Sequence, residues 1–154
     1  MDIKDYWNGR AATDKVNATT NDVFMRELER ETLIAHLRRL GCHSRSQVLD
    51  AGCGDGGTIF ALDAAFSCAL TGCDYSTSMI DLARQKLAES PNPRIDFVVA
   101  DVLEIDAVFR SQSFDFVSTG RCLINLKSTE DQFAAIGALA RLLRPGGVYL
   151  AIEN

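Results

Sequence analysis

The sequence lacks the features that mark membrane, secreted or nucleic-acid-binding proteins. Lys and Arg number 16 against 21 Asp and Glu, which gives a formal net charge of -5 and leaves no basic excess for a nucleic-acid surface. No apolar run approaches the roughly 18 residues that a membrane-spanning helix needs. The first residues also lack the charged-then-apolar pattern of a signal peptide. We therefore expect a cytoplasmic protein with no nucleic-acid or membrane partner.

Cysteine and histidine are few and poorly spaced for metal or disulfide chemistry. The five cysteines are odd in number and form no Cys-x-x-Cys pair, so we expect reduced thiols that pack as small apolar side chains. His36 and His43 have no Cys, Asp or Glu at metal-ligand spacing. We predict no metal site, and we find no Cys/His pair or Ser-His-Asp set that would indicate nucleophilic catalysis.

What remains fits a single globular domain preceded by a polar segment. With 154 residues, 47% hydrophobic and 24% charged, the chain has the length and composition of one core. Residues 1–20 are largely polar, contain Tyr6 and Trp7, and show no clear period. They are interpreted as an N-terminal arm that either forms a lid over a pocket or is pinned to the core. Residues 21–154 form the main domain.

The main domain alternates helical and strand patterns. Apolar residues recur at three- and four-residue spacing over residues 21–40, with Thr20 or Asn21 as N-cap and Gly41 after the last turn. Five strands that alternate with helices predict an α/β fold with a mostly parallel sheet covered on both faces. The expected strands are 47–51, 69–73, 95–100, 114–119 and 148–152, and the expected helices between them are 58–66, 77–89, 105–109 and 128–143.

A glycine-rich turn follows the first expected strand. The segment Gly52-Cys53-Gly54-Asp55-Gly56-Gly57 matches G-x-G-x-x-G, a pattern typical of turns that hold nucleotide-like ligands at a helix N-terminus. Asp50 directly precedes it, Asp74 ends the second strand and Asp101 follows the third. Because the carboxyl ends of parallel strands meet at one edge of a sheet, we expect these three carboxylates to converge there.

The carboxylates discriminate between two kinds of nucleotide ligand. NAD would place an anionic pyrophosphate against Asp50 and Asp55, and each like-charge pair at about 6 Å costs roughly 2 to 3 kcal/mol at an effective dielectric near 20. A nucleoside with a cationic tail is favoured, with Asp74 accepting from the ribose hydroxyls and Asp101 from the adenine amino group. S-adenosylmethionine, which carries a sulfonium, an ammonium and one carboxylate, meets this description. A short-chain NAD-dependent reductase would also need Tyr-x-x-x-Lys, which no tyrosine of this chain provides.

Five segments resemble, in order, the motifs of class I S-adenosylmethionine-dependent methyltransferases. The first resembles motif I, an apolar pair and an acidic residue followed by Gly-x-Gly-x-Gly. The others resemble the acidic end of the second strand, the adenine-contacting segment, the fourth strand and the turn before the fifth. They are Val48-Leu49-Asp50-Ala51-Gly52-Cys53-Gly54-Asp55-Gly56, Asp74-Tyr75-Ser76 with Met79, Ala100-Asp101-Val102, Phe114-Asp115-Phe116-Val117 and Leu142-Leu143-Arg144-Pro145-Gly146-Gly147.

The resemblance implies a three-layer Rossmann-like sandwich with a parallel five-stranded sheet in the order 3-2-1-4-5. It assigns Arg121 and Asn125 to the acceptor side, although Asn125 also fits a loop or capping residue and Met79 a core residue. An N-terminal helix over the cofactor is common in the family, which implies a lid that includes Tyr6, Trp7 and Arg26. The implied cofactor-binding residues are Asp50, Ala51, Gly52, Cys53, Gly54, Asp74, Tyr75, Met79, Asp101, Val102, Thr119 and Gly120.

The chain departs from the family after the fifth strand, where members continue with a helix and the antiparallel strands 6 and 7. We therefore expect a C-terminally truncated S-adenosylmethionine-dependent methyltransferase that acts on a small-molecule acceptor by in-line displacement. The apolar edge of its fifth strand would favour self-association. The alternatives are a cofactor-binding fragment or interaction module without activity of its own, and an NAD-dependent reductase. The sequence indicates neither the acceptor nor a general base.

Overall fold

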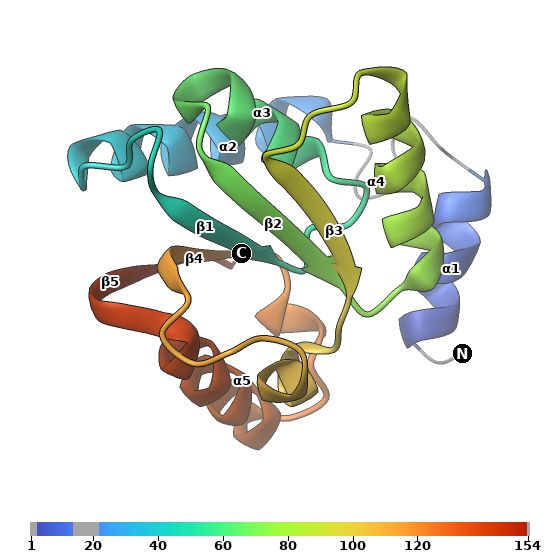
Figure 1. The fold of residues 1–154 in the computed structure, drawn as a ribbon. Coiled ribbons are helices and arrows are strands. Elements are labelled where there is room, and N and C mark those ends of the chain that lie inside the picture. Colours follow the sequence, from blue (N-terminus) through green and yellow to red (C-terminus); the bar gives the residue numbers. More distant parts are fainter. Residues whose placement is uncertain (1–2, 14–21, 154) are drawn as a thin grey trace.

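The computed structural model describes residues 3–13 and 22–153 and contains a five-stranded sheet (Figure 1). Its strand pairings are parallel, and neighbouring strands follow the order β3-β2-β1-β4-β5. This confirms the predicted α/β fold and its strand order. The strands are β1 (Gln47–Ala51), β2 (Ala69–Asp74), β3 (Ile95–Val99), β4 (Phe114–Gly120) and β5 (Leu143–Ile152).

Helices cover both faces of the sheet and give the fold three layers (Figure 1). One face packs against α2 (Val23–Arg39), α3 (Gly57–Phe66) and α4 (Thr77–Glu89). The other packs against α5 (Thr129–Leu142) and the short 3-10 helices η1 (Val102–Ala107) and η2 (Leu123–Asn125). Successive strand residues point to opposite faces, so β1 places Val48 in the first core and Leu49 in the second.

The helices begin at polar capping residues. Ser76 and Ser128 cap α4 and α5, each accepting a hydrogen bond from the backbone N–H three residues further on. The N-cap of α2 is Asp22, whose carboxylate accepts from a backbone N–H at 2.8 Å. The expected caps, Thr20 and Asn21, lie outside the described residues. The assignment was wrong because aspartate, one residue later, caps a helix as well as asparagine does.

Two elements begin three or more residues before the expected position, while the other boundaries agree within two residues. The helix expected at 105–109 is the 3-10 helix η1, which starts at Val102 because the Asp101 carboxylate accepts from the Leu103 N–H at 3.0 Å. β5 begins at Leu143 instead of 148 and continues past a left-handed Gly146, with an irregularity where it pairs β4. Sheet pairing therefore extends through the turn that the glycines suggested.

The N-terminal segment contains a helix, which its sequence pattern did not predict. α1 (Ile3–Thr13) lies against α4, where Ala11 packs with Met79 and Leu82, and Trp7 contacts this cluster. The Asn8 amide oxygen also accepts a hydrogen bond from the Ser76 hydroxyl at 2.6 Å. Too few apolar residues of α1 pack against the core to give the sequence a helical period. Residues 3–13 are therefore pinned to the core, and their action as a lid stays a prediction.

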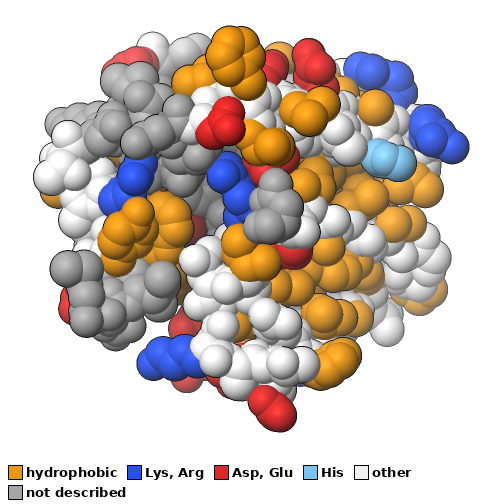
Figure 2. Space-filling view, turned by 180° about the vertical axis from the view of Figure 1, so that it is seen from behind, with side chains coloured by type: hydrophobic (Ala, Val, Ile, Leu, Met, Phe, Trp, Pro, Cys, Tyr) orange, Lys and Arg blue, Asp and Glu red, His pale blue; other side chains and the backbone are white. Residues whose placement is uncertain are grey.

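β5 forms one edge of the sheet, as expected. Its residues Val148, Leu150 and Ile152 are partly buried against the first core, and in the view from behind, apolar side chains gather on the side of this edge (Figure 2). Self-association through the edge stays a prediction. Within residues 3–13 and 22–153, no helix has the length and apolar character needed to cross a membrane.

Candidate functional site

The glycine turn is wedged between two neighbouring segments. The backbone N–H groups of Gly52 and Cys53 both donate to the carbonyl oxygen of Cys73 at the end of β2, at 2.8 and 2.9 Å. Gly52 has a φ of +79°, and a Cβ added there would lie 2.7 Å from the Cβ of Cys122 in the loop after β4. Only glycine satisfies both the left-handed backbone and the close approach. The Cys53 side chain, in contrast, packs into the first core.

Asp74, at the end of β2, holds the glycine turn by hydrogen bonds. One carboxylate oxygen accepts from the Gly54 N–H at 3.0 Å and the other from the Ser76 N–H at 2.9 Å. The residue is buried, with 8% of its surface exposed. Burial raises the pKa of Asp74, and its two backbone hydrogen bonds oppose this shift. Asp74 therefore lies against the glycine turn, as the sequence predicts.

Asp50 lies beneath the turn at the end of β1 and is also buried, with 4% exposed. The Ser118 hydroxyl of β4 donates to its carboxylate at 2.8 Å. Burial raises the pKa of Asp50 to about 7, the Ser118 hydrogen bond opposes the shift, and the negative charge of Asp74 adds to it. Without a bound cation, this carboxyl group changes its charge near neutral pH.

Asp55 does not act as the free negative charge that the sequence argument assumed. Lys86 of α4 donates to one of its carboxylate oxygens at 2.6 Å, and the Gly57 N–H donates to the other at 3.3 Å. Its side chain is 4% exposed. The lysine neutralises Asp55, so the claim that this residue repels an anionic ligand was wrong.

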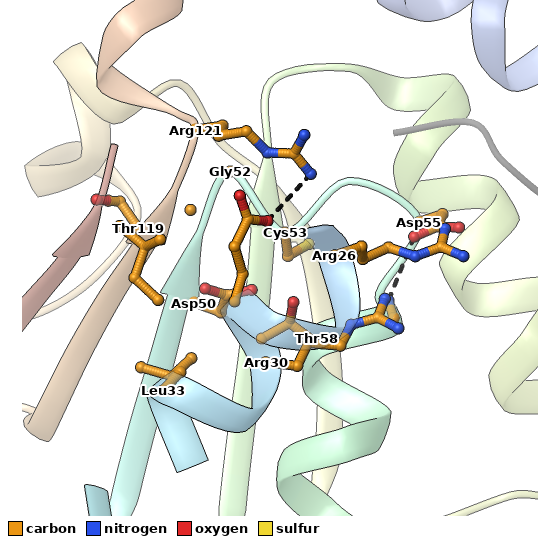
Figure 3. Close-up of a pocket in the computed structure, with 14 residues that line it drawn as sticks. Arg26, Arg30, Leu33, Asp50, Gly52, Cys53, Asp55, Thr58, Thr119 and Arg121 are labelled. Carbon is orange, nitrogen blue, oxygen red and sulfur yellow. Dashed lines mark hydrogen bonds and ion pairs between the residues drawn. The ribbon is translucent and has the colours of Figure 1, made fainter. Parts of the chain in front are cut away.

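Two pockets open on either side of the glycine turn. The α2 pocket, so named for the helix that closes it, lies between α2, the turn and the ends of β4 and β5 (Figure 3). The α1 pocket lies between α1, the start of α4 and the loop after β4. The first is lined by Arg26, Glu29, Arg30, Leu33, Asp50, Gly52, Cys53, Asp55, Gly57, Thr58, Thr119, Gly120, Arg121 and Ile152. The second is lined by Trp7, Gly52, Gly54, Tyr75, Met79, Gly120, Arg121, Cys122, Ile124 and Asn125.

The loop after β4 separates the two pockets and is held from several sides. Arg121 is left-handed, with a φ of +51°, its N–H donates to the Ile152 carbonyl at 2.8 Å, and its carbonyl accepts from the Asn125 amide at 2.6 Å. Its guanidinium pairs with Glu29 of α2 at 3.2 Å across the α2 pocket (Figure 3). The structure thus gives Asn125 the loop-bracing role that was the alternative to acceptor contact, although it still lines the α1 pocket.

The structure brings most of the expected site residues to these pockets. Tyr75, Met79 and Gly54 line the α1 pocket, while Asp50, Cys53 and Thr119 line the α2 pocket. The Thr119 hydroxyl shares a 2.7 Å hydrogen bond with the Tyr149 hydroxyl. The expected residues that line neither pocket are Ala51 and Val102, which are buried in the second core, Asp74, which holds the turn, and Asp101, which is exposed at the start of η1.

Beyond Arg26 of α2 and Met79 of α4, sequence reasoning missed further contributions of these two helices. Glu29, Arg30 and Leu33 line the α2 pocket, and Lys86 neutralises Asp55. The alternating charges of α2 are typical of a solvated helix face, so they gave no signal of a pocket. Within the described part of the chain, no group of His, Cys, Asp and Glu side chains lies close enough to hold a metal ion.

The fold and the site define a Rossmann-like domain with a glycine turn between β1 and α3, at the carboxyl edge of the sheet, where folds of this kind bind their ligands. A family model described as a methyltransferase domain matches residues 48–147. The chain therefore belongs to the methyltransferase domain family, which confirms the resemblance to class I S-adenosylmethionine-dependent methyltransferases.

Individual relatives agree with this family. The chain is 29% identical over 120 residues to demethylmenaquinone methyltransferase of Staphylococcus aureus (strain JH9), covering 77% of this chain and 47% of the relative. The chain thus spans about half the length of the curated relatives it matches. Phosphoethanolamine N-methyltransferase 2 of Haemonchus contortus, solved with S-adenosylhomocysteine, is 31% identical with a TM-score of 0.65, covering 79% of this chain and 27% of that one.

The same fold also occurs in a protein named for another reaction. The [4+2]-cyclase SpnF superposes with a TM-score of 0.70 at 22% identity, covering 80% of this chain and 44% of SpnF. At this identity the likeness concerns the fold alone. Fold class therefore does not by itself select the chemistry, which depends on the residues of the site.

Proposed function

We propose that this chain binds S-adenosylmethionine across the glycine turn and takes part in methyl transfer to a small-molecule acceptor by in-line displacement. The observation that carries the proposal is the turn itself, which Asp74 fastens at Gly54 between two pockets. Membership of the methyltransferase domain family supports it. We also propose a cytoplasmic location and, given the net charge of -5, no nucleic-acid partner.

The residues present fit this cofactor. Each carboxylate oxygen of Asp74 has a further lone pair, so it can accept from ribose hydroxyls while holding the Gly54 and Ser76 N–H groups. Trp7, Tyr75 and Met79 line the α1 pocket with the flat or apolar surface that suits a purine. The Asp50 carboxylate in the α2 pocket can hold an ammonium group.

The cofactor supplies a methyl group on a sulfonium, which is a good leaving group. The protein's part is to align the acceptor and exclude water, which can contribute roughly 7 to 11 kcal/mol without covalent catalysis. Among the polar groups near the loop after β4, Thr119 bonds to Tyr149 and Asn125 braces the backbone. Arg121, which lines both pockets, remains our candidate for contact with the acceptor.

The names of two relatives indicate the class of acceptor. The relatives named above are called methyltransferases of demethylmenaquinone and phosphoethanolamine, which are both small molecules. The chain covers 47% and 27% of these two proteins, so residues outside this chain can contribute to acceptor choice in them. The second candidate is a cofactor-binding fragment without turnover, and this difference in length favours it. Methyl transfer assayed over an acceptor panel distinguishes the two.

We expect Asp74→Asn to weaken S-adenosylmethionine binding by about 1 to 3 kcal/mol in calorimetric titration, because charge-assisted ribose hydrogen bonds are lost. Asparagine keeps the shape of the side chain and one acceptor oxygen, which limits the damage to the turn. Asp81→Asn, at an exposed position of α4, is the matched control and should bind as the unchanged protein does. Equal affinities for all three proteins would contradict the role of Asp74 in holding the ribose. Binding of NAD in place of S-adenosylmethionine would contradict the proposed function.

A further inference from the structure

The carboxylate of Glu153, directly after β5, lies against the loop that follows β4. One of its oxygens accepts a hydrogen bond from the backbone N–H of Cys122 and the other from that of Ile124, both at 3.3 Å. The two N–H groups therefore point toward the same carboxylate. Hydrogen bonds of this kind are charge-assisted and stronger than those between neutral groups.

The start of this loop has an unfavourable backbone that the end of β5 holds in place. Arg121 has a φ of +51°, a left-handed conformation that costs energy for any residue other than glycine. Its N–H donates to the Ile152 carbonyl at 2.8 Å. Cys122 is the N-cap of η2, and within the described structure its side chain makes no capping hydrogen bond. Glu153 supplies that cap from the neighbouring strand by accepting from Ile124.

The position of the loop affects the shape of both pockets. Arg121 lines the α1 pocket and the α2 pocket, and Cys122 and Ile124 line the α1 pocket. Cys122 also lies against the glycine turn, since a Cβ added to Gly52 would be 2.7 Å from the Cβ of Cys122. Among the described residues that line the two pockets, Glu153 does not occur. It can therefore influence a ligand only through the loop.

From these contacts we infer that Glu153 is a positioning residue of the proposed methyl-transfer site. Its carboxylate holds the backbone of the loop after β4, so that Arg121 and Ile124 stand at the pockets and Cys122 stays against the glycine turn. The Ile124 N–H is exposed, so water can replace the carboxylate there and the stability of the fold depends little on this bond. The inference rests on the proposed function, because it concerns the same two pockets.

The test uses three substitutions that separate the reach of the Glu153 side chain from its charge. Glu153→Ala removes the carboxylate, Glu153→Asp keeps the charge on a shorter side chain, and Glu153→Gln keeps the length and one acceptor oxygen. In calorimetric titration, the affinity for S-adenosylmethionine should fall by about tenfold in the alanine and aspartate variants, as for the loss of one hydrogen bond to a charged group. The glutamine variant should recover part of this loss. Glu89→Ala, at the exposed end of α4, is the control and should bind as the unchanged protein does.

Amide hydrogen exchange of the ligand-free protein, followed by NMR, tests the loop independently of the cofactor. In Glu153→Ala the amide protons of Cys122 and Ile124 should exchange about tenfold faster, because their acceptor is lost. The amide of Asp131, which Ser128 holds, should exchange as before. The thermal midpoint should change by less than about 2 °C. A purely structural role would instead lower the midpoint and speed up exchange throughout the domain.

The outcomes separate this inference from the proposed function. If the unchanged protein does not bind S-adenosylmethionine, the proposed function fails, and the inference that rests on it fails too. If the unchanged protein binds and Glu153→Ala binds equally well, the positioning role is refuted while cofactor binding stands. Should Glu153→Ala fold poorly, the other two variants decide. Tighter binding by Glu153→Gln than by Glu153→Asp supports the inference, and equal or weaker binding refutes it.

Discussion

Replacing Gly52 by alanine is expected to destabilise the protein by roughly 2 to 4 kcal/mol and to abolish measurable cofactor binding. Alanine is strained at a φ of +79°, and its Cβ would lie 2.7 Å from Cys122 Cβ and 2.8 Å from Cys122 Sγ. Strain in the left-handed region costs about 1 to 2 kcal/mol and overpacking about 1 to 3 kcal/mol. Thermal unfolding and calorimetric titration measure the two effects.

A matched glycine substitution shows whether the effect belongs to this position. Gly137 lies within α5, where an added Cβ would meet only the Arg141 side chain at an ordinary contact distance of 3.6 Å. Gly137→Ala should raise stability by up to about 1 kcal/mol, because alanine favours the helix, and should leave cofactor binding intact. If Gly52→Ala behaves like Gly137→Ala, the wedged turn described above is wrong.

Asp50→Asn is expected to make the ligand-free protein more stable at pH 8 by on the order of 1 to 3 kcal/mol. The folded-state pKa of Asp50, about 7, lies above its ordinary value of 3.8. Its contribution to stability is therefore fully present below pH 3.8 and is lost as the pH rises through 7. Asparagine cannot ionise, so its advantage should disappear toward pH 4. Urea unfolding at pH 4.5 and pH 8 measures the difference.

The same substitution should weaken cofactor binding while it stabilises the fold. We propose that ionised Asp50 holds the ammonium group of S-adenosylmethionine. The affinity of the unchanged protein for this cofactor should then fall by about tenfold from pH 8 to pH 6, because the Asp50 carboxylate takes up a proton. Asp50→Asn should bind more weakly at pH 8 and show no such pH dependence. A variant that is less stable at pH 8 and binds normally would reduce Asp50 to a structural acceptor for Ser118.

The expected gain in stability and the expected loss of cofactor affinity in Asp50→Asn have one cause, the buried negative charge of Asp50. Burial of Asp50 disfavours its charge in the ligand-free protein, and a bound ammonium would restore that charge. Arg30, which lines the same pocket, partly offsets this effect, because its positive charge lowers the pKa of Asp50.

Local patterns in the sequence were sufficient to predict the alternating elements of the main domain and to place Asp74 beside the glycine turn. Apolar runs that alternate with helical periods predicted the parallel sheet and the helices between its strands. The glycine turn and Asp74 were placed together because carboxyl ends of parallel strands share one edge. These inferences needed only neighbours along the chain and the topology that follows from them.

The tertiary structure alone decided which charged side chains of the site form ion pairs with one another. Lys86 reaches Asp55 from α4, Arg121 reaches Glu29 across the α2 pocket, and Arg26 and Arg30 arrive from a helix that precedes the sheet. Pairs of this kind depend on how helices pack over the turn, and sequence spacing carries no record of that packing. The sequence determined an acidic strand edge with a glycine turn, and the packing of α2 and α4 brought basic side chains against that edge.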